Sequence, residues 1–493
     1  MSEKVATYTG PASVRPQADG QLPRGLLLVS SVAVAAIGLW QLGAGSHGQR
    51  DWPIGVTAVC CAWLVVYSIS SYLYFRVAYL FSTFYVAVLI LFHLSAPIVD
   101  AVGWYPGLAN AAEISPKWLE LSGWYVILSL GSFGSGLALS LRQRKRAADQ
   151  SHESYQNRAS LFQDGIGLLI ISAGLLTWAF YTAGNLLTFS RADLFRGVGD
   201  TRGLGVFLMI FPSALVLVTL GATSRTGKVF AAVLALAGFV LVMLSGYRTS
   251  ALYPLVVGAI VWRKLGRRIP STLAAGGVIV LMLAASFVGL LRQGGSYASI
   301  DRTTIQAAAE KASPTDTVRL GQTGALLAHV LRLVPTEEGY RYGTSYLEAL
   351  RRSVPNVTSE IAESSRQTVK RAAFSGARVS QLAPSDWLTY HIAPWAFDIG
   401  QGVGFTAIGE AYLNFGTAGV VGFFGLLGFF FGRLDQVDLA SHPGCLLFAA
   451  AFLWHLVRTV RDDFANFTKP AVFTLLFIIV WRLAMRISPF RIK

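Results

Sequence analysis

Charged residues are scarce in this chain. Only 14% of its 493 residues are Asp, Glu, Lys or Arg, whereas 53% are hydrophobic, and the mean hydropathy is +0.52. A soluble protein of this length carries charge at about a quarter of its positions. The shortage of charge therefore excludes the soluble enzyme classes and indicates a chain that lies in a membrane.

Acidic residues are scarcer than basic ones, and cysteine is nearly absent. The 26 Asp and Glu residues stand against 41 Lys and Arg residues, which gives a net charge of +15. In a membrane chain this excess is expected on cytoplasmic loops, so we expect no nucleic-acid partner. Cys60, Cys61 and Cys445 all lie in apolar segments, which excludes a disulfide framework and a zinc site. The motifs GxxxxGK(S/T) and HExxH are also missing.

Long apolar runs are abundant. A helix needs roughly 20 apolar residues to cross a bilayer, and twelve segments meet or approach that length. They are 26–44, 54–74, 77–99, 118–141, 165–187, 204–222, 229–245, 251–262, 273–291, 417–432, 445–457 and 471–485. Segments 251–262 and 445–457 are short, so we expect each to be tilted, broken or shielded by neighbours. The sequence predicts an all-α, polytopic integral membrane protein with about 12 transmembrane helices.

Basic residues in the short loops indicate which side of the membrane each loop occupies. They follow the fourth, sixth, eighth and last segments, in the clusters Arg142, Arg144, Lys145 and Arg146; Arg225 and Lys228; Arg263, Lys264, Arg267 and Arg268; and Arg486, Arg491 and Lys493. Lys and Arg are retained in the cytoplasm, so both termini are expected there. The predicted parts are a disordered cytosolic tail (1–22), a bundle of about nine helices (23–291), a large outer loop (292–403) and C-terminal transmembrane helices (404–493).

The large outer loop has its own helical pattern. Apolar residues recur at helical spacing in 326–333 and 346–350, and prolines separate these runs. We expect several short helices that cap the bundle on its periplasmic or extracellular face.

Arginines on this outer face are the first candidate functional residues. Arg248 lies in a hairpin between two apolar runs, and Arg292 follows the ninth segment. A guanidinium there can bind the diphosphate of a lipid carrier through paired hydrogen bonds, or it can extend to lipid head groups. Arg191 and Arg196 lie in another outer hairpin, where a phosphate, an acidic sugar or the neighbouring aspartates could pair with them.

A histidine among aromatic residues is the second candidate. His391 lies close in sequence to Asp386 and Asp398. An imidazole can take a hydroxyl proton near neutral pH, and a carboxylate can orient it; a buried histidine held by one hydrogen bond is the structural alternative. Trp387 and Tyr390 could stack on sugar rings or anchor the chain at the interface.

A carboxylate next to the bilayer is the third candidate. Glu410 stands just before an apolar helix, where an unpaired charge is costly. We expect it to pair with Arg458 or Arg461, which should return to the same face after 445–457. Glycines at three-residue intervals from 416 to 428 leave a groove for a second helix or for a lipid tail, and close helix packing is the interpretation we favour.

Four stretches, taken together and in their order along the chain, resemble the O-antigen or oligosaccharide repeat-unit polymerase family (Wzy-type) of bacterial envelope synthesis. The strongest is 404–416, with Gly404-Phe405-Thr406 and Gly409-Glu410-Ala411-Tyr412-Leu413-Asn414-Phe415-Gly416, followed by the glycine-rich helix. The others are 339–347 with Val354-Pro355, 246–250, and Arg461-Asp462-Asp463-Phe464. The resemblance extends mainly over 191–467.

The resemblance implies a GT-C-type glycosyltransferase in the bacterial plasma membrane, with its active site facing outward. A glycan would leave its undecaprenyl diphosphate carrier for a hydroxyl of the next lipid-linked unit, without nucleotide sugar, metal or other cofactor. Arg248, Arg292, Arg191 and Arg196 would stabilise the leaving diphosphate, and His391 would be the general base. The expected binding residues are Arg191, Arg196, Arg302, Arg378, Tyr247, Trp387, Tyr390, Glu410, Arg458 and Arg461. Membrane lipids and a chain-length regulator protein are the other expected partners.

Two rival functions fit part of the pattern. An O-antigen ligase uses the same donor and the same arginine chemistry but a different acceptor; the order of the stretches favours the polymerase. A transporter of lipid-linked glycans needs ionisable residues along the membrane midplane and no structured outer loop. The nearly charge-free membrane segments and the arginine-rich outer loop favour catalysis.

Overall fold

The computed structural model contains helices and no strands in the part of the chain that it describes. That part comprises residues 21–45, 51–75, 80–104, 114–141, 153–183, 202–222, 224–244, 248–265, 323–354, 382–398, 402–439 and 441–487, with Val379 and isolated positions between 272 and 310. The helices in the first half are α1 (Gln21–Ala44), α2 (Trp52–Phe75), α3 (Phe81–His93), α4 (Ser95–Ala101), α5 (Pro116–Ser140), α6 (Glu153–Ala183), α8 (Arg202–Gly221), α9 (Arg225–Leu244) and α10 (Arg248–Lys264). Those in the second half are α13 (Thr323–Leu333), α14 (Thr344–Ser353), α16 (Pro384–Ile392), α17 (Pro394–Asp398), α18 (Ala407–Gln436), α19 (Pro443–Ala451), α20 (Leu453–Arg458), η7 (Thr459–Arg461) and α21 (Ala465–Ile487).

Several helices are long and apolar enough to cross a membrane. Within the described residues five meet that test, in α1, α2, α6, α18 and α21, and two bent pairs raise the number to seven. One pair is α19 with α20 and η7, bent by 43°; of the alternatives expected for 445–457, tilted, broken or shielded, the structure shows a broken helix. The other is α3 with α4, bent by 67°, where we expected one continuous segment. The total of 12 stays a prediction.

The break between α3 and α4 has a local cause. Pro97 has no N–H to donate to the carbonyl of His93, and its ring would collide with that carbonyl in a continuous helix. The chain therefore ends one helix at His93 and starts the next at Ser95. Gly324 of α13 lies against the His93 carbonyl, where a Cβ would come within 2.9 Å of the oxygen.

Glycines let three helices approach closely. α5 packs along α1 on one side and along α18 on the other. A Cβ at Gly131 would collide with the backbone of α1 near Ala35, and a Cβ at Gly428 would collide with the Phe133 carbonyl. The prediction that the glycine-rich helix serves close packing is confirmed on this face.

Gly428→Ala is therefore expected to destabilise the fold by about 1–3 kcal/mol, because the added methyl group must push α18 away from α5. Gly422→Ala is the matched control, since nothing lies within 4 Å of a Cβ at that position of the same helix. Melting of the two purified variants in detergent, followed by intrinsic fluorescence, compares them. Equal melting temperatures would contradict the packing argument.

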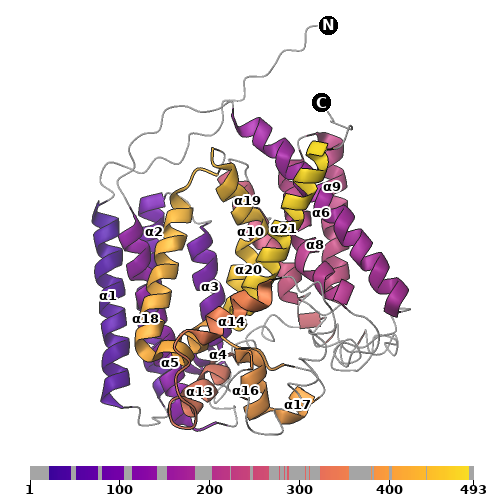
Figure 1. The fold of residues 1–493 in the computed structure, drawn as a ribbon. Coiled ribbons are helices and arrows are strands. Elements are labelled where there is room, and N and C mark those ends of the chain that lie inside the picture. The colour runs from indigo at the N-terminus through magenta and orange to yellow at the C-terminus, as the bar shows by residue number, and fades with distance from the viewer. Residues whose placement is uncertain are drawn as a thin grey trace.

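A second group of helices, α6, α8, α9, α10 and α21, packs beside the first (Figure 1). Arg482 of α21 pairs with Asp164 of α6, with 2.9 Å between Nε and Oδ1. The bent helices α19 and α20 join the groups: the Ser213 hydroxyl of α8 donates to the Ala451 carbonyl at 2.6 Å and accepts from Trp454 Nε1 at 3.0 Å.

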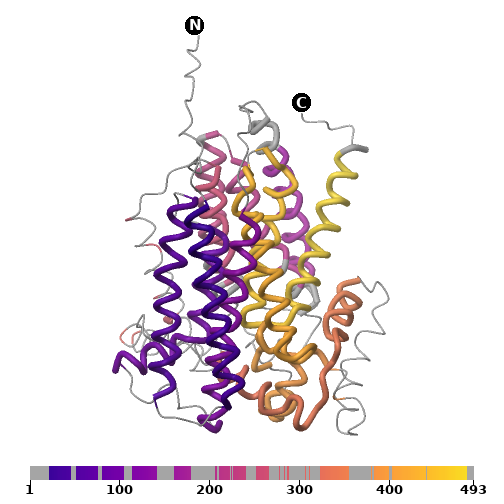
Figure 2. Tube along the Cα trace, turned by 90° about the vertical axis from the view of Figure 1, so that its left-hand side faces the viewer, coloured from indigo at the N-terminus to yellow at the C-terminus, as the bar shows by residue number. Residues whose placement is uncertain are grey.

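The two ends of the bundle differ in what they carry. At one end the Asp435 carboxylate of α18 accepts hydrogen bonds from the backbone N–H groups of Phe81 (2.9 Å) and Ser82 (3.1 Å) and lies 3.7 Å from Lys264 Nζ. The short helices α13, α14, α16 and α17 lie at the opposite end (Figures 1 and 2). The short helices predicted for 326–333 and 346–350 are thus present as α13 and α14.

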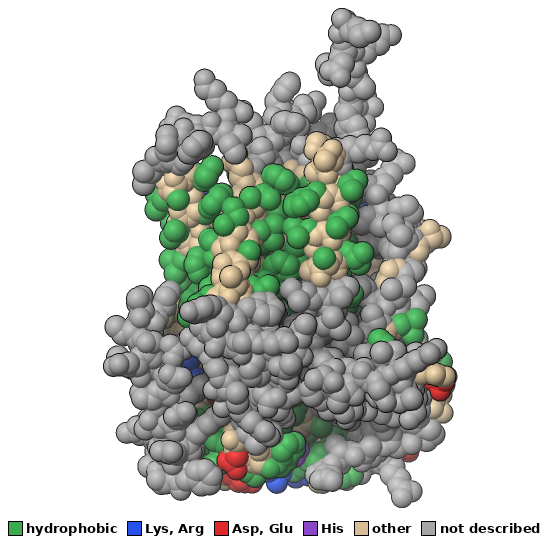
Figure 3. Space-filling model, turned by 90° about the vertical axis from the view of Figure 1, so that its right-hand side faces the viewer, with side chains coloured by type: hydrophobic (Ala, Val, Ile, Leu, Met, Phe, Trp, Pro, Cys, Tyr) green, Lys and Arg blue, Asp and Glu red, His purple; other side chains and the backbone are tan. Residues whose placement is uncertain are grey.

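The outer side of the bundle is apolar. The large hydrophobic side chains exposed there include Leu26, Val29, Val32 and Trp40 on α1, Val229, Phe230, Val233 and Leu236 on α9, and Leu475, Leu476, Ile479, Val480 and Leu483 on α21. On the face shown in Figure 3, hydrophobic side chains cover the upper half, and the charged ones drawn there lie below them. This apolar belt is what a lipid-facing surface requires.

Candidate functional site

A break in α18 begins the candidate site. Phe415 and Gly416 have non-helical backbone angles, and Gly416, with φ 61° and ψ −149°, occupies a region that essentially only glycine adopts. The break leaves the carbonyls of the preceding turn without helical donors. Arg341 N–H donates to the Leu413 carbonyl at 2.9 Å, and Tyr342 N–H donates to the Asn414 carbonyl at 3.0 Å.

The segment that supplies these donors is a tight turn before α14. Tyr342 (φ 47°) and Gly343 (φ 87°) are both left-handed, which lets three successive N–H groups point the same way. The third, of Gly343, donates to Asn414 Oδ1 at 2.9 Å. The turn is thereby fixed to the first part of α18, and it holds the Arg341 side chain beside that helix.

Glu410 lies beneath this turn and is 2% exposed. Its carboxylate accepts from the Ser345 hydroxyl and from the Phe464 N–H, both at 2.7 Å. Asn414 Nδ2 donates to the Ser345 oxygen at 2.7 Å and completes the network. We expected Glu410 among the binding residues; both of its carboxylate oxygens are engaged within the protein, where the buried side chain ties three segments together.

The expected ion pair of Glu410 with Arg458 or Arg461 was wrong. Arg458 instead pairs with Asp462 one turn later, with 3.0 Å between Nη2 and Oδ2. The Arg461 guanidinium lies 5.6 Å from the centre of the Phe92 ring. The arginines do return to the face of Glu410, since the Arg461 carbonyl accepts from Phe405 N–H at 3.4 Å. The carboxylate takes neutral donors because these nearer contacts occupy the arginines.

A histidine and a carboxylate meet next to the turn. His391 Nε2 lies 2.9 Å from Glu338 Oε1, and Trp387 Nε1 donates to Glu338 Oε2 at 2.8 Å. His391 and Trp387 come from α16, one helical turn apart, whereas Glu338 precedes the turn by three residues. Trp387 is 0% exposed, so its ring is not available to stack on a sugar, contrary to our expectation. Its indole N–H orients Glu338 instead.

Glu338 remains a carboxylate in this position. Burial raises its pKa, but the hydrogen bonds from His391 and Trp387, helped by the charges of His391 and Arg341, outweigh burial and bring the pKa below its ordinary value. A carboxylate can only accept hydrogen bonds, so the contact with His391 requires a proton on Nε2. The lone pair of the neutral imidazole is then on Nδ1.

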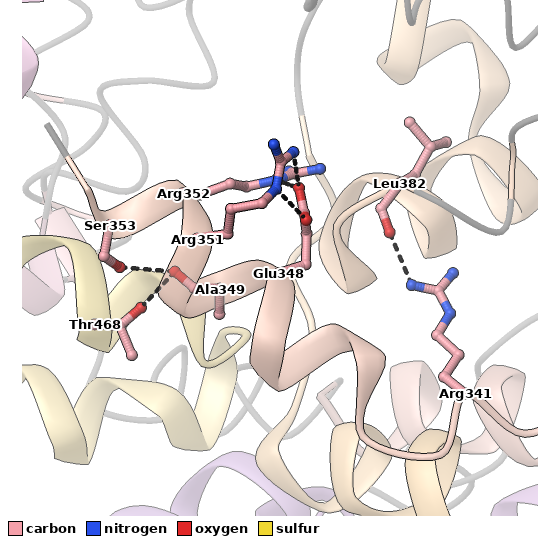
Figure 4. A network of polar contacts seen from close by, with 8 residues as sticks. All are labelled: Arg341, Glu348, Ala349, Arg351, Arg352, Ser353, Leu382 and Thr468. Atoms are coloured by element: carbon pink, nitrogen blue, oxygen red, sulfur yellow. Dashed lines mark hydrogen bonds and ion pairs between the residues drawn. The ribbon is translucent and has the colours of Figure 1, made fainter. Parts of the chain in front are cut away.

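The Arg341 guanidinium lies against the same group. Its centre is 5.4 Å from the middle of the Trp387 ring, and Nη1 donates to the Leu382 carbonyl at 2.8 Å (Figure 4). Nε and Nη2 are buried and have no hydrogen-bond partner among the described residues. Burial lowers the pKa of Arg341, and the charges of Glu338 and Glu410 offset part of this. Guanidinium N–H donors without an acceptor are suited to bind an anion.

Asp463 connects α16 to the rest of the site. It is buried, and its Oδ2 accepts from the hydroxyl of Ser385 at 2.7 Å and from the Ser385 N–H at 3.2 Å. Asn466 Nδ2 donates to Asp463 Oδ1 at 2.9 Å. Stretches 339–347, 404–416 and 461–464, distant in the sequence, therefore form one unit.

The comparison with protein families decides what this unit belongs to. The family described as O-antigen polysaccharide polymerase Wzy matches residues 29–488, nearly the whole chain. The chain belongs to this family. No curated protein and no solved structure matches it. The resemblance seen in the sequence is thus confirmed, and the apolar helices together with the Wzy family make the chain an integral membrane protein of polysaccharide synthesis.

Only some of the site residues predicted for this Wzy chain lie in the described part. Outside it are Arg191, Arg196, Tyr247, Arg292, Arg302 and Arg378. The backbone of Arg248 begins α10. Tyr390 lies edge-on to His391, with ring centroids 5.5 Å apart. Within the described residues, no three His, Cys, Asp or Glu side chains gather as a metal site.

Sequence reasoning missed four residues of the candidate site. Arg341, Ser345 and Asp463 all belong to the stretches that resemble the family, so the signal was present but was not attached to single residues. Glu338 had no such signal. The carboxylate expected next to His391 was Asp386 or Asp398, whereas the observed partner is 53 positions away in the chain.

Proposed function

We propose that this Wzy-family chain transfers a growing glycan from undecaprenyl diphosphate to a hydroxyl of a lipid-linked repeat unit. The observation that supports it best is the Glu338–His391 pair beside a buried guanidinium with two unpartnered N–H groups. The pair lies at the end of the bundle opposite to Lys264 and Asp435, so the positive-inside rule assigns it to the outer face of the bacterial plasma membrane.

His391 acts as the general base in this proposal. The acceptor hydroxyl gives its proton to Nδ1 while its oxygen forms the new bond to the anomeric carbon of the donor sugar. The bond from that carbon to the diphosphate oxygen breaks, and the diphosphate leaves with the electron pair. Glu338 fixes the proton on Nε2, orients the ring and stabilises the imidazolium that forms, as a carboxylate does in other carboxylate–imidazole pairs.

Arginines stabilise the charge that develops on the leaving diphosphate. The sequence assigns Arg248, Arg292, Arg191 and Arg196 to this role, and Arg341 adds two buried N–H groups. Guanidinium groups stay charged and bind phosphate oxygens in pairs, so they provide this stabilisation without a metal. Membrane lipids surround the bundle, and a chain-length regulator stays a predicted partner.

Loss of the chain separates this proposal from its rivals. A deletion strain is expected to display single repeat units on its surface acceptor, visible on a gel as loss of the ladder above one unit. Loss of a ligase would leave no unit attached, and loss of a transporter would do the same. Arg248→Ala and Arg292→Ala, expressed at normal level, should each abolish the ladder. Normal ladders in both variants would remove the assignment of these arginines to the diphosphate.

A further inference from the structure

Helix α14 is attached to the bundle by one face. Ser345, Ala349 and Ser353 are buried on it, at intervals of four residues, which places them on one side of a helix. The Thr468 hydroxyl of α21 donates to the Ala349 carbonyl at 3.2 Å, and the Ser353 hydroxyl donates to the same carbonyl at 2.7 Å (Figure 4). The small side chains of this face fix α14 to the first turn of α21.

The opposite face of α14 is apolar and exposed. Leu347 is 67% exposed, Leu350 53%, and Val354, directly after the helix, 68%. Their spacing of three and four residues forms a single stripe, which we call the α14 stripe. Exposing side chains of this size to water is unfavourable, so three of them on one stripe indicate a surface that is covered in its natural setting.

The position of the α14 stripe identifies what covers it. α14 lies beside the lower end of α21 (Figures 1 and 2). The exposed apolar positions of α21 begin at Leu475, seven residues after Thr468. At the rise of an α-helix this is about 10 Å along α21. The stripe therefore continues the apolar belt at its border, where amphipathic helices bury an apolar face about 5–10 Å into the boundary between head groups and acyl chains.

The charges of α14 suit that boundary. Glu348 Oε2 is 2.7 Å from Arg351 Nε, and Glu348 Oε1 is 2.7 Å from Arg352 Nε (Figure 4). Two arginines and one glutamate leave the helix with an excess of one positive charge. Long arginine stems can cover apolar surface while their heads reach phosphate groups, which favours a lipid surface over a second apolar protein face.

We propose that α14 is an interfacial helix whose Leu347, Leu350 and Val354 stripe inserts into the head-group boundary of the bilayer. Its assignment to the outer leaflet rests on the proposed function. The same helix carries Ser345, which binds Glu410, and directly follows the turn that positions Arg341. Insertion of α14 then fixes the distance of the candidate site from the bilayer surface. A site that acts on a diphosphate attached to a membrane lipid requires such a fixed distance.

Spin-label accessibility tests the proposal on the full chain. Leu347→Cys and Leu350→Cys, in a chain whose three native cysteines are replaced by alanine, are labelled in nanodiscs of phosphatidylethanolamine and phosphatidylglycerol. Ile479→Cys on α21 is the lipid-exposed reference, and Glu337→Cys, exposed before the Arg341 turn, is the water-exposed reference. Power saturation compares access of oxygen with access of a water-soluble nickel chelate.

The ratio of oxygen to nickel access at both stripe positions is expected to exceed that at Glu337→Cys several-fold and to approach that at Ile479→Cys. A ratio equal to that at Glu337→Cys would overturn the proposal, because the stripe would then lie in water. Poor access of both reagents would also overturn it and would indicate a protein partner or a second copy. The measurement needs no turnover, so its failure is distinct from failure of the proposed function.

Discussion

Replacing His391 with alanine is expected to reduce polymer formation by about 10²–10⁴-fold, the contribution of a positioned general base. The surface glycan would then end at single repeat units, while the protein stays at its normal level, because the ring is only partly buried at the rim of the site. The measurement is the ladder on a gel, with quantitative immunoblotting of the membrane fraction.

Glu338→Gln should cause a smaller loss of the same kind. A glutamine can present its amide to the imidazole in place of a carboxylate, so it no longer enforces a proton on Nε2 or stabilises the imidazolium. Glu337→Gln is the matched control: the neighbouring side chain is exposed, and its substitution should leave the ladder unchanged. Equal ladders for Glu338→Gln and Glu337→Gln would contradict the hypothesis that Glu338 supports the general base.

The pH dependence follows from the lowered pKa of Glu338. Its folded-state value is below the unfolded one, so the stabilisation from its pairing is fully present above the unfolded pKa and is lost as pH falls through the folded pKa. Neutral and mildly acidic media therefore leave the carboxylate charged. A variant that lacks the Glu338 carboxylate should melt at a lower temperature than the parent protein at neutral pH. The difference between the two melting temperatures should shrink in strong acid.

Arg341→Ala and Arg341→Lys are both expected to lose polymer formation by about 10²–10³-fold, comparable to the removal of one preorganised donor to a developing anion. Lysine keeps the positive charge but lacks the planar fork that directs Nε and Nη2 into the protein. Arg433→Ala, at the far end of α18, is the control and should behave like the parent protein.

Both Arg341 variants are expected to remain folded. The contacts of Arg341 with the Trp387 ring and the Leu382 carbonyl are worth about 0.5–1 kcal/mol and about 1 kcal/mol respectively, so both variants should fold with slightly lowered melting temperatures. Normal polymer ladders in both, whatever their stability, would show that the unpartnered N–H groups bind no reacting group. A large fall in melting temperature with proportionate loss of protein would show that the residue holds the fold.

Local patterns predicted the helices because the relevant forces are local. Prolines at the first positions of α16 and α17 and the apolar spacing in α13 and α14 act within a turn or two of the chain. The break at residue 94 was missed because a hydropathy window averages over Pro97. The cause of the break, Pro97, was nevertheless visible in the sequence.

The contacts of the candidate site depend on tertiary placement and could not be read in the same way. Glu338 and His391 are joined only because α16 folds back over the Arg341 turn, across 53 positions. Glu410 was assigned an arginine because a charge was expected to need an opposite charge. The structure satisfies it with a hydroxyl and a backbone N–H, a solution that no spacing rule indicates.

The Phe464 N–H that holds Glu410 comes late in the chain, and this has a consequence for biosynthesis. α18 must first pack against α5, which is made 292 residues earlier at the Tyr125–Thr417 contact. A ribosome that stalls before residue 464 releases a chain that can still enter the membrane but cannot close the unit. Premature termination would thus yield inert protein rather than a catalyst that works without control.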